Sequence, residues 1–177
     1  MLYYWINLAF IYLRCRFFTN SVAIEETVSH QRRVGVFDCE GLRFMSNSKY
    51  PFYMDFIRYE LLFRSPLQRA TLKQGMLGML GSQKIIYRRP LKLWQCFTLT
   101  LSLEGWEGNW AYHKHVFSRK GEIYAIGYTK LAFLKGKKPF DMEQIIRDGG
   151  YEGPKRIPDE EILLLFRGDS DLLRIPL

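Results

Sequence analysis

The sequence predicts an α+β domain in which one long buried helix is wrapped by a five-stranded antiparallel sheet. Three observations support this prediction. A broad apolar stripe runs through residues 50–72, one strand-like segment precedes it, and four more follow it between residues 82 and 134. The chain of 177 residues, of which 47% are apolar, is long enough for one such domain with its own core and is not of the disordered class.

Residues 50–72 show the clearest helical pattern. Apolar residues recur there at intervals of three and four positions, and the stripe is wider than a surface helix shows. We therefore predict a helix that is buried on more than one side. Ser48 is a candidate N-cap, Pro51 suits the first turn, and Pro66 is expected to kink or end the helix.

The strand-like segments alternate polar and apolar residues with a period of two. The first covers residues 29–38. Turns at 107–109 and 119–121 predict that the later strands form an antiparallel meander. These later strands are predicted at 82–89, 93–106, 110–119 and 122–134.

The sequence shows no motif for a metal or a cofactor. His113 and His115 share one face of a predicted strand, but no third ligand accompanies them and the three cysteines are scattered. We interpret the two histidines as an exposed or hydrogen-bonded pair. No metal and no cofactor are therefore expected.

Two segments flank the predicted domain at 28–135. Residues 1–18 form an apolar helix that is short for the roughly 20 apolar residues needed to cross a bilayer. It could anchor the chain to a membrane, pack on a partner protein, or be buried in the domain itself. Residues 136–177 form a C-terminal extension with short helices near 141–147 and 160–166 and an apolar end.

The formal charge of +8 is concentrated in residues 1–150. A basic body suits a nucleic acid, an anionic membrane surface or a phosphate-bearing ligand, and it equally suits a solvated surface. Three tryptophans could form a base-stacking platform, but no RNA-binding signature surrounds them. Nucleic acid is therefore an unlikely partner. These tryptophans are Trp94, Trp106 and Trp110.

Residues 38–50 read Asp-Cys-Glu-Gly-Leu-Arg-Phe-Met-Ser-Asn-Ser-Lys-Tyr. This segment resembles the signature of the 4-hydroxybenzoyl-CoA thioesterase-like family, whose members adopt the hotdog fold. Within that family, the membrane-anchored "thioesterase superfamily member six" proteins also begin with an apolar segment that runs into Leu-Arg-x-Arg, as residues 13–16 do here. The positions that match the signature are Asp38, Glu40, Met45, Asn47 and Tyr50, with Glu replacing the second Asp.

The resemblance implies a thioester-hydrolysing site at the start of the buried helix. Glu40 takes the position of the nucleophile or general base, supported by Asp38. The backbone amides around Ser46, Asn47 and Ser48 take the position that polarises the thioester carbonyl, where a helix N-terminus offers unpaired N–H groups. Asn47 could also orient a water molecule.

The resemblance also implies where the substrate binds. Ser46, Ser48 and Tyr50 are candidate substrate-binding residues near the thioester. Arg88 and Arg89 are candidates for holding the nucleotide of acyl-CoA. In the family the acyl chain lies against the buried helix, usually at a dimer interface, so a homodimer or heterodimer is expected.

Three further residues depart from the family pattern. Phe44 stands where the family usually has His, Ser46 stands where it has the first Asn, and Arg43 replaces a residue that is often Gly. We therefore expect a membrane-associated, thioesterase-like hotdog protein that serves as an accessory or structural subunit of a mitochondrial membrane assembly. Its membrane or membrane-protein contacts are expected through residues 1–18.

An active enzyme is the alternative interpretation. It would hydrolyse fatty-acyl thioesters of coenzyme A or acyl-carrier protein, with the same residues at its site. The expected location is the inner mitochondrial membrane, with the endomembrane system as the alternative.

Overall fold

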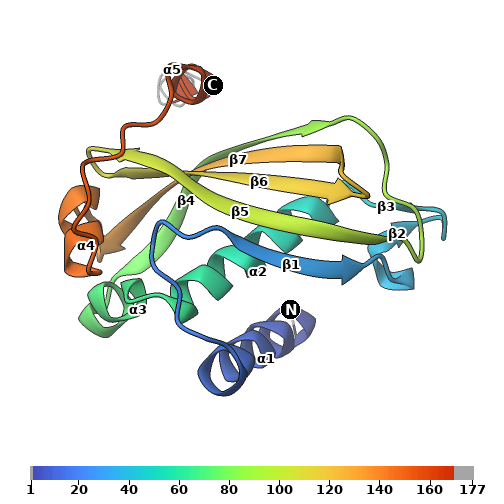
Figure 1. The fold of residues 1–177 in the computed structure, drawn as a ribbon, viewed down its shortest axis with the longest axis horizontal. Helices are drawn as coiled ribbons and strands as arrows, with labels where there is room; N and C mark the ends of the chain where they lie inside the picture. Colours follow the sequence, from blue (N-terminus) through green and yellow to red (C-terminus); the bar gives the residue numbers. More distant parts are fainter. Residues whose placement is uncertain (1, 170–177) are drawn as a thin grey trace.

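The computed structural model describes residues 2–169 and confirms the α+β hotdog arrangement, with an antiparallel sheet packed around the central helix α2 (Figure 1). The elements are α1 (Leu2–Phe18), β1 (Val28–Arg33), a 3₁₀ turn (Val36–Asp38), β2 (Cys39–Glu40), β3 (Phe44–Met45), α2 (Lys49–Arg64), α3 (Leu67–Ala70), a second 3₁₀ turn (Leu72–Gln74), β4 (Leu77–Tyr87), β5 (Cys96–Glu107), β6 (Trp110–Arg119), β7 (Glu122–Lys135), β8 (Lys138–Pro139), α4 (Met142–Asp148) and α5 (Glu160–Leu165).

The strand order in the sheet is β1-β5-β6-β7-β4, and the two-residue β8 pairs with β7. Strands β5, β6 and β7 follow one another as antiparallel hairpins, as the turn signals predict. The prediction that the four later strands form one meander is wrong for β4. This strand does not pair with β5, the next strand in the chain, but lies at the edge of the sheet beside β7. Each strand's own alternation reports which face is buried and says nothing about which strand lies next to it.

Two strand boundaries also differ from the prediction. Strand β4 begins at Leu77, whereas the predicted strand began at residue 82. Gly81 therefore lies inside the strand and does not precede it. A Cβ atom at Gly81 would lie 2.4 Å from the ring of Trp110, so the lack of a side chain here leaves room for that ring. The pairing of β4 with β7 changes register at the same point, between Leu80 and Ser82. Strand β1 ends at Arg33, and residues 36–38 form a 3₁₀ turn.

Helix α2 ends at Arg64, just before Pro66, as predicted. Its sheet-facing side forms the main core with the inner side chains of β5, β6 and β7. The helix packs tightly on the sheet at Gly127, where a Cβ atom would lie 2.6 Å from the sulfur of Met54. The α2 residues in this core are Tyr50, Met54, Ile57 and Leu61.

The opposite side of α2 is covered by α1, so the molecule has three layers: sheet, α2 and α1 (Figure 1). This confirms that α2 is buried on more than one side. One face of α1 is therefore part of the domain. The contact joins Tyr4, Leu8, Ile11 and Cys15 of α1 to Phe52, Phe56 and Phe63 of α2.

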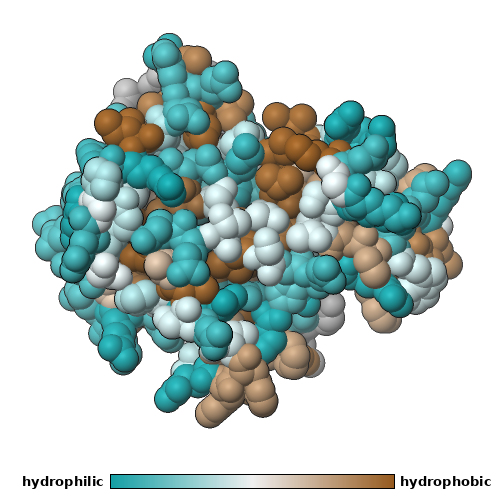
Figure 2. All heavy atoms as spheres, in the orientation of Figure 1, coloured by the Kyte–Doolittle hydropathy of each residue, from teal (hydrophilic) through white to brown (hydrophobic). Residues whose placement is uncertain are grey.

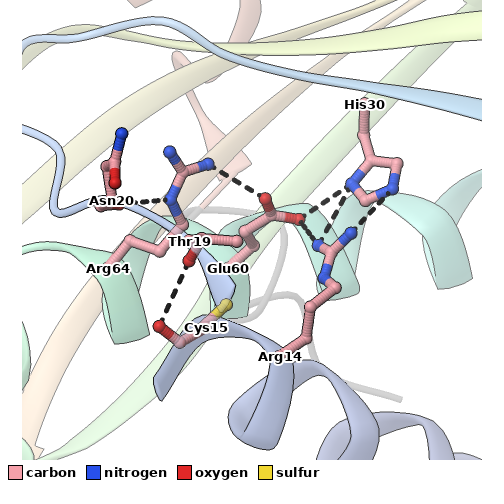
Figure 3. A network of polar contacts seen from close by, with 7 residues as sticks. All are labelled: Arg14, Cys15, Thr19, Asn20, His30, Glu60 and Arg64. Atoms are coloured by element: carbon pink, nitrogen blue, oxygen red, sulfur yellow. Dashed lines mark hydrogen bonds and ion pairs between the residues drawn. The ribbon is translucent and has the colours of Figure 1, made fainter. Parts of the chain in front are cut away.

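A polar network fastens α1 at the edge of this contact (Figure 3). Glu60 of α2, with a side chain only 4% exposed, accepts hydrogen bonds from Arg14 of α1 at 2.5 Å and from Arg64 at 3.1 Å, and its carboxylate lies 2.9 Å from His30 of β1. Burial alone would raise the pKa of Glu60, but the hydrogen bond with His30 and the charge of Arg14 lower it below its usual value. One carboxylate therefore joins three elements.

The outer face of α1 remains exposed and aromatic. Apolar side chains project at the lower edge of the molecule, where α1 lies (Figure 2). Within residues 2–169, no helix combines the length and the apolar character needed to cross a bilayer. The most exposed large side chains of this face are Trp5, Phe10, Phe17 and Phe18.

The C-terminal extension contains both predicted helices. Asp141 caps α4 by accepting a hydrogen bond from the backbone of Gln144 at 3.0 Å, as predicted. Helix α5 packs through Ile162 and Phe166 on Tyr112, on the side of the sheet away from α2 (Figure 1). The predicted apolar end at residues 172–177 lies outside the described residues.

Candidate functional site

A short hairpin places the signature residues beside the start of α2. Strand β2 pairs with β3, with Cys39 opposite Met45 and Glu40 opposite Phe44. The other edge of β3 is bonded to the loop after β4, because the Met45 N–H donates to the Leu91 carbonyl at 2.8 Å. The hairpin is thus held from both sides, and the chain passes directly from β3 into α2.

Glu40 is exposed and is held against the start of α2. Its carboxylate accepts a hydrogen bond from the Ser46 hydroxyl at 2.5 Å, and that hydroxyl lies 2.9 Å from the hydroxyl of Ser48. Ser48 occupies the N-cap position of α2, but its side chain makes no capping hydrogen bond because it faces Ser46. The structure therefore brings the predicted acid and both predicted serines together.

The backbone amides at this helix start are not equally available. The Ser46 N–H donates to the Asp38 carbonyl at 2.7 Å, and the Ser48 N–H donates to the Ser46 hydroxyl at 3.3 Å. Within residues 2–169 the structure shows no hydrogen bond from the Asn47 N–H. Asn47 is also exposed. Of the three predicted amides, that of Asn47 is the one left for a ligand.

Asp38 is buried and has a structural role here. Its carboxylate accepts hydrogen bonds from the Gly35 N–H and the Tyr53 hydroxyl, each at 2.8 Å, and lies 3.7 Å from the Lys49 ammonium. These contacts fix the 3₁₀ turn before β2 against α2. Asp38 thus supports Glu40 by positioning the hairpin.

The predicted substrate-binding residues divide between core and surface. Tyr50 is 1% exposed and packs on the rings of Tyr87 and Phe117, so it lies in the core beneath the hairpin. Arg88 and Arg89 are exposed just after β4, and Arg89 forms an ion pair with Glu122.

The end of β4 lies next to the signature segment. The Tyr87 hydroxyl donates to the Asn47 carbonyl at 3.5 Å, which places the two arginines that follow Tyr87 near the start of α2. The Arg43 guanidinium lies over the Phe44 ring at 4.9 Å, so two of the departures from the family pattern pack on each other.

A cavity of about 360 Å³ lies farther along α2. It opens beside the first residues of β4, and its walls come from the second half of α2, the inner face of the sheet and α4. None of residues 38–50 lines it. Its wall is mainly aliphatic and includes Leu61, Leu62, Leu103, Leu131, Phe133 and Ile146.

Five ionisable residues also line this cavity: Asp55, Arg58, His113, Tyr4 and Tyr59. Arg58 forms an ion pair with Asp55, and one of its terminal nitrogens lies 3.5 Å from the His115 ring. Burial and the charge of Arg58 lower the pKa of His113 to about 3, and the same causes lower the pKa of His115. Both rings are therefore neutral at physiological pH.

Of the two predicted alternatives for His113 and His115, exposure is wrong, whereas a hydrogen-bond contact holds for His115, whose Nε2 atom lies 3.5 Å from Arg58. The two histidines are 7% and 0% exposed, because they share the inner face of β6 with Phe117. The His113 Nδ1 atom is buried without a hydrogen-bond partner among residues 2–169. Over that same range, no group of three His, Cys, Asp or Glu side chains is arranged to hold a metal ion.

Comparison with known proteins identifies the family. The family model for the thioesterase-like superfamily matches residues 34–160, which include the hairpin, α2 and all the long strands after it. The chain belongs to the thioesterase-like superfamily.

Relatives within this superfamily are distant in sequence. Protein THEM6 of Xenopus laevis is 27% identical over 134 residues, a match that covers 75% of this chain and 64% of THEM6. The chain thus spans less than two thirds of that relative.

Solved hotdog structures confirm the fold. The probable thioesterase YbaW of Escherichia coli is 18% identical with a TM-score of 0.64, over 68% of this chain and 94% of YbaW. The 4-hydroxybenzoyl CoA thioesterase of Pseudomonas sp. strain CBS-3 is 12% identical with a TM-score of 0.60, over 69% of this chain and 98% of the enzyme.

Proposed function

We propose that this thioesterase-like protein hydrolyses acyl thioesters of coenzyme A or acyl-carrier protein, with Glu40 as its catalytic carboxylate. The observation that carries the proposal is that the Glu40 carboxylate is hydrogen-bonded to Ser46, the residue just before the unpaired Asn47 N–H at the start of α2. Hydrolysis needs a base to activate water and a donor for the oxygen that becomes negatively charged. The hairpin supplies both at one surface.

The proposed reaction assigns one role to each group. Glu40 takes a proton from water, whose oxygen attacks the thioester carbon. The carbonyl oxygen becomes an oxyanion and accepts a hydrogen bond from the Asn47 N–H. Collapse of the intermediate breaks the C–S bond, and the proton held by Glu40 passes to the leaving thiolate. The products are the free carboxylic acid and the thiol.

Thioester hydrolysis by the purified full chain tests this proposal against a panel of acyl-CoA substrates. Glu40→Gln is expected to lower kcat/KM by about a hundredfold or more, because positioned acid–base groups contribute on the order of 10²–10⁴ in rate. Glu152→Gln makes the same chemical change at an exposed position outside the site and serves as the matched control. No hydrolysis by the wild type, or an unchanged rate in Glu40→Gln, would refute the proposal.

We also propose that two copies associate through β4. This strand lies at one edge of the sheet and exposes Leu77, Met79, Ile86 and Tyr87. An exposed apolar edge strand is a template for pairing with another chain. Light scattering coupled to size-exclusion chromatography should give twice the mass of one chain, and a monomer at micromolar concentration would count against this arrangement.

The exposed aromatic face of α1 supports a proposal of membrane association. Trp5, Phe10, Phe17 and Phe18 can insert at the level of the headgroups while the other face of α1 stays on α2. Flotation with phosphatidylcholine vesicles should recover the wild type, and replacing Phe17 and Phe18 by Ser should reduce recovery severalfold. Fluorescence microscopy of the tagged full chain tests the proposed mitochondrial inner membrane against the endomembrane system.

An accessory subunit of a membrane assembly is the second candidate. The stacked Arg43 and Phe44, which depart from the family pattern beside Glu40, favour it. Affinity purification from native membranes with the wild type and with Glu40→Gln separates the two functions. Stable co-purifying subunits retained by both forms, together with no hydrolysis, support the accessory role, and isolation of a partner-free dimer contradicts it.

A further inference from the structure

The cavity beside the second half of α2 is shaped for a small apolar ligand. Its volume of about 360 Å³ lies within the range of roughly 300–1,000 Å³ that is typical of small-molecule sites. Aliphatic side chains from α2, the sheet and α4 form its wall, so a sugar or a nucleotide would lose hydrogen bonds there. The exposed residues Leu77, Met79 and Leu80 of β4 mark its open side.

One part of the cavity wall is polar and has unused hydrogen-bonding capacity. His113 lines the cavity, is 7% exposed, and leaves its Nδ1 atom without a partner among residues 2–169. Buried polar atoms in native proteins nearly always have a partner in the protein, a bound water or a ligand. Arg58 lies beside it, with its guanidinium 3.5 Å from the His115 ring.

The polar part of the cavity wall holds one buried cation, Arg58, which is paired with Asp55. Arg58 has a side chain 14% exposed, whereas its partner Asp55 is 37% exposed and therefore better solvated. The positive charge of Arg58 contributes to the lowered pKa of both His113 and His115, so its potential extends over the inner face of β6. A guanidinium matches the planar, two-oxygen geometry of a carboxylate.

From this arrangement we infer that the cavity binds an aliphatic carboxylic acid of the fatty-acid class. The carboxylate accepts hydrogen bonds from Arg58 and from the neutral His113 ring, and the chain lies along the aliphatic wall. Tyr4 of α1 also lines the cavity, so the ligand lies beside the helix with the exposed aromatic face. This inference is independent of catalysis at Glu40, because no residue of the hairpin lines the cavity.

Isothermal titration calorimetry of the full chain in detergent-free buffer tests the inference. The probes are dodecanoate, dodecanol and dodecanoyl-CoA, below their micellar concentrations. Dodecanoate is expected to bind at one site per chain and at least tenfold more tightly than dodecanol, which lacks the carboxylate. Dodecanoyl-CoA is titrated into the Glu40→Gln variant, so that hydrolysis does not release dodecanoate, and it is expected to bind this cavity more weakly than dodecanoate because it carries no free carboxylate for Arg58.

Three variants locate the binding. Arg58→Met is expected to weaken dodecanoate binding at least tenfold and to leave dodecanol binding unchanged. Ala111→Leu fills the cavity from the sheet side while keeping Arg58, and it is expected to abolish dodecanoate binding. Arg69→Met removes the same charge from an exposed position of α3 and is expected to bind like the wild type. Thermal melts identify any variant that fails to fold. If Arg58→Met fails to fold, Ala111→Leu still tests whether the ligand occupies the cavity.

Several results would overturn the inference. They are a lack of saturable dodecanoate binding by the wild type, equal affinities for dodecanoate and dodecanol, and full binding by folded Ala111→Leu. Titration of Glu40→Gln separates this inference from the proposed hydrolysis. That variant should bind dodecanoate like the wild type, and loss of its binding would place the ligand at the hairpin instead.

Discussion

The two ends of α2 differ in how their polar groups are satisfied. At the first end, Asp38 is buried with several partners, and Glu40 is held by Ser46. At the second end, Arg58 and His113 adjoin an aliphatic cavity, and the His113 Nδ1 atom has no partner among residues 2–169. The signature and the cavity are thus separated along one helix.

This difference separates polar residues that stabilise the fold from polar residues that are available to bind a ligand. A buried polar group whose hydrogen bonds are complete stabilises the fold, whereas an incomplete one marks a place that a ligand or water can fill. By this criterion Asp38 is structural and the His113 ring is a proposed site of recognition, whereas the Asn47 N–H is exposed and has its proposed role from its place at the start of α2. Four predictions test the criterion, from the largest expected effect to the smallest.

The Asn47 amide should matter more than its side chain. Asn47→Pro removes the N–H and is expected to lower kcat/KM for acyl-CoA hydrolysis about a hundredfold, as loss of one oxyanion donor does. Asn47→Ala keeps the N–H and should stay within a few-fold of the wild type. Steady-state kinetics on both variants, with circular dichroism as a check on folding, measures the effect. Equal activities would remove the amide from the proposed site.

Glu60 should stabilise the layer that covers the second end of α2. Glu60→Gln leaves Arg14 and Arg64 without an anionic partner and is expected to lower the free energy of unfolding by about 2 kcal/mol. The loss is smaller than the roughly 3–5 kcal/mol of a fully buried pair, because both arginines keep contact with water. Urea denaturation at pH 7 measures it.

The pH dependence of stability provides the control for Glu60. Because the folded state lowers the pKa of this carboxyl below its ordinary value of 4.5, its contribution is present above that pH and is lost as the pH falls through the lowered pKa. The difference in unfolding free energy between wild type and Glu60→Gln should therefore shrink in acid. A difference that stays constant down to pH 3 would contradict the assigned network.

Asp38 should behave as a structural residue. Asp38→Ala leaves the Gly35 N–H and the Tyr53 hydroxyl without their acceptor, and it is expected to cost about 1–2 kcal/mol of unfolding free energy. Asp38→Asn keeps one acceptor oxygen and should lose less. A change in kcat/KM without a change in stability would instead give Asp38 a chemical role.

His113 should behave in the opposite way. His113→Phe replaces a buried ring nitrogen that has no partner with an apolar ring of similar size, so the unfolding free energy should change by less than about 1 kcal/mol in either direction. Dodecanoate binding should weaken in the same variant. A large loss of stability would show that His113 is already fully satisfied in the folded chain.

The sequence is sufficient to predict most elements of the fold. The helical stripe, the end before Pro66, the Asp141 cap and the β5–β6–β7 hairpins all follow from local patterns, and the structure confirms them. The convergence of Glu40 with Ser46 and Ser48 also agrees with the resemblance. These features depend on residues close together in the chain.

The features that the sequence does not predict depend on long-range contacts. Nothing local to β4 shows that it pairs with β7, and nothing local to α1 shows that Phe52 and Phe56 are what it covers. The cavity joins Arg58 to His113, which are far apart in the chain. Two local signals indicate that these residues are buried. Arg58 is a cation within the apolar stripe of α2, and His113 lies on the same strand face as Phe117.

Because α1 packs on α2, cleaving α1 from the chain would not release an intact domain from a membrane or partner bound to α1. The face of α1 that holds Ile11 and Cys15 completes the core, while its outer face carries Trp5 and Phe10. Proteolytic removal of α1 would expose the aromatic side of α2 and leave Glu60 without one of its arginines. Helix α1 therefore cannot be removed without destabilising the domain, because the segment that would attach the protein to a membrane or partner also forms part of its core.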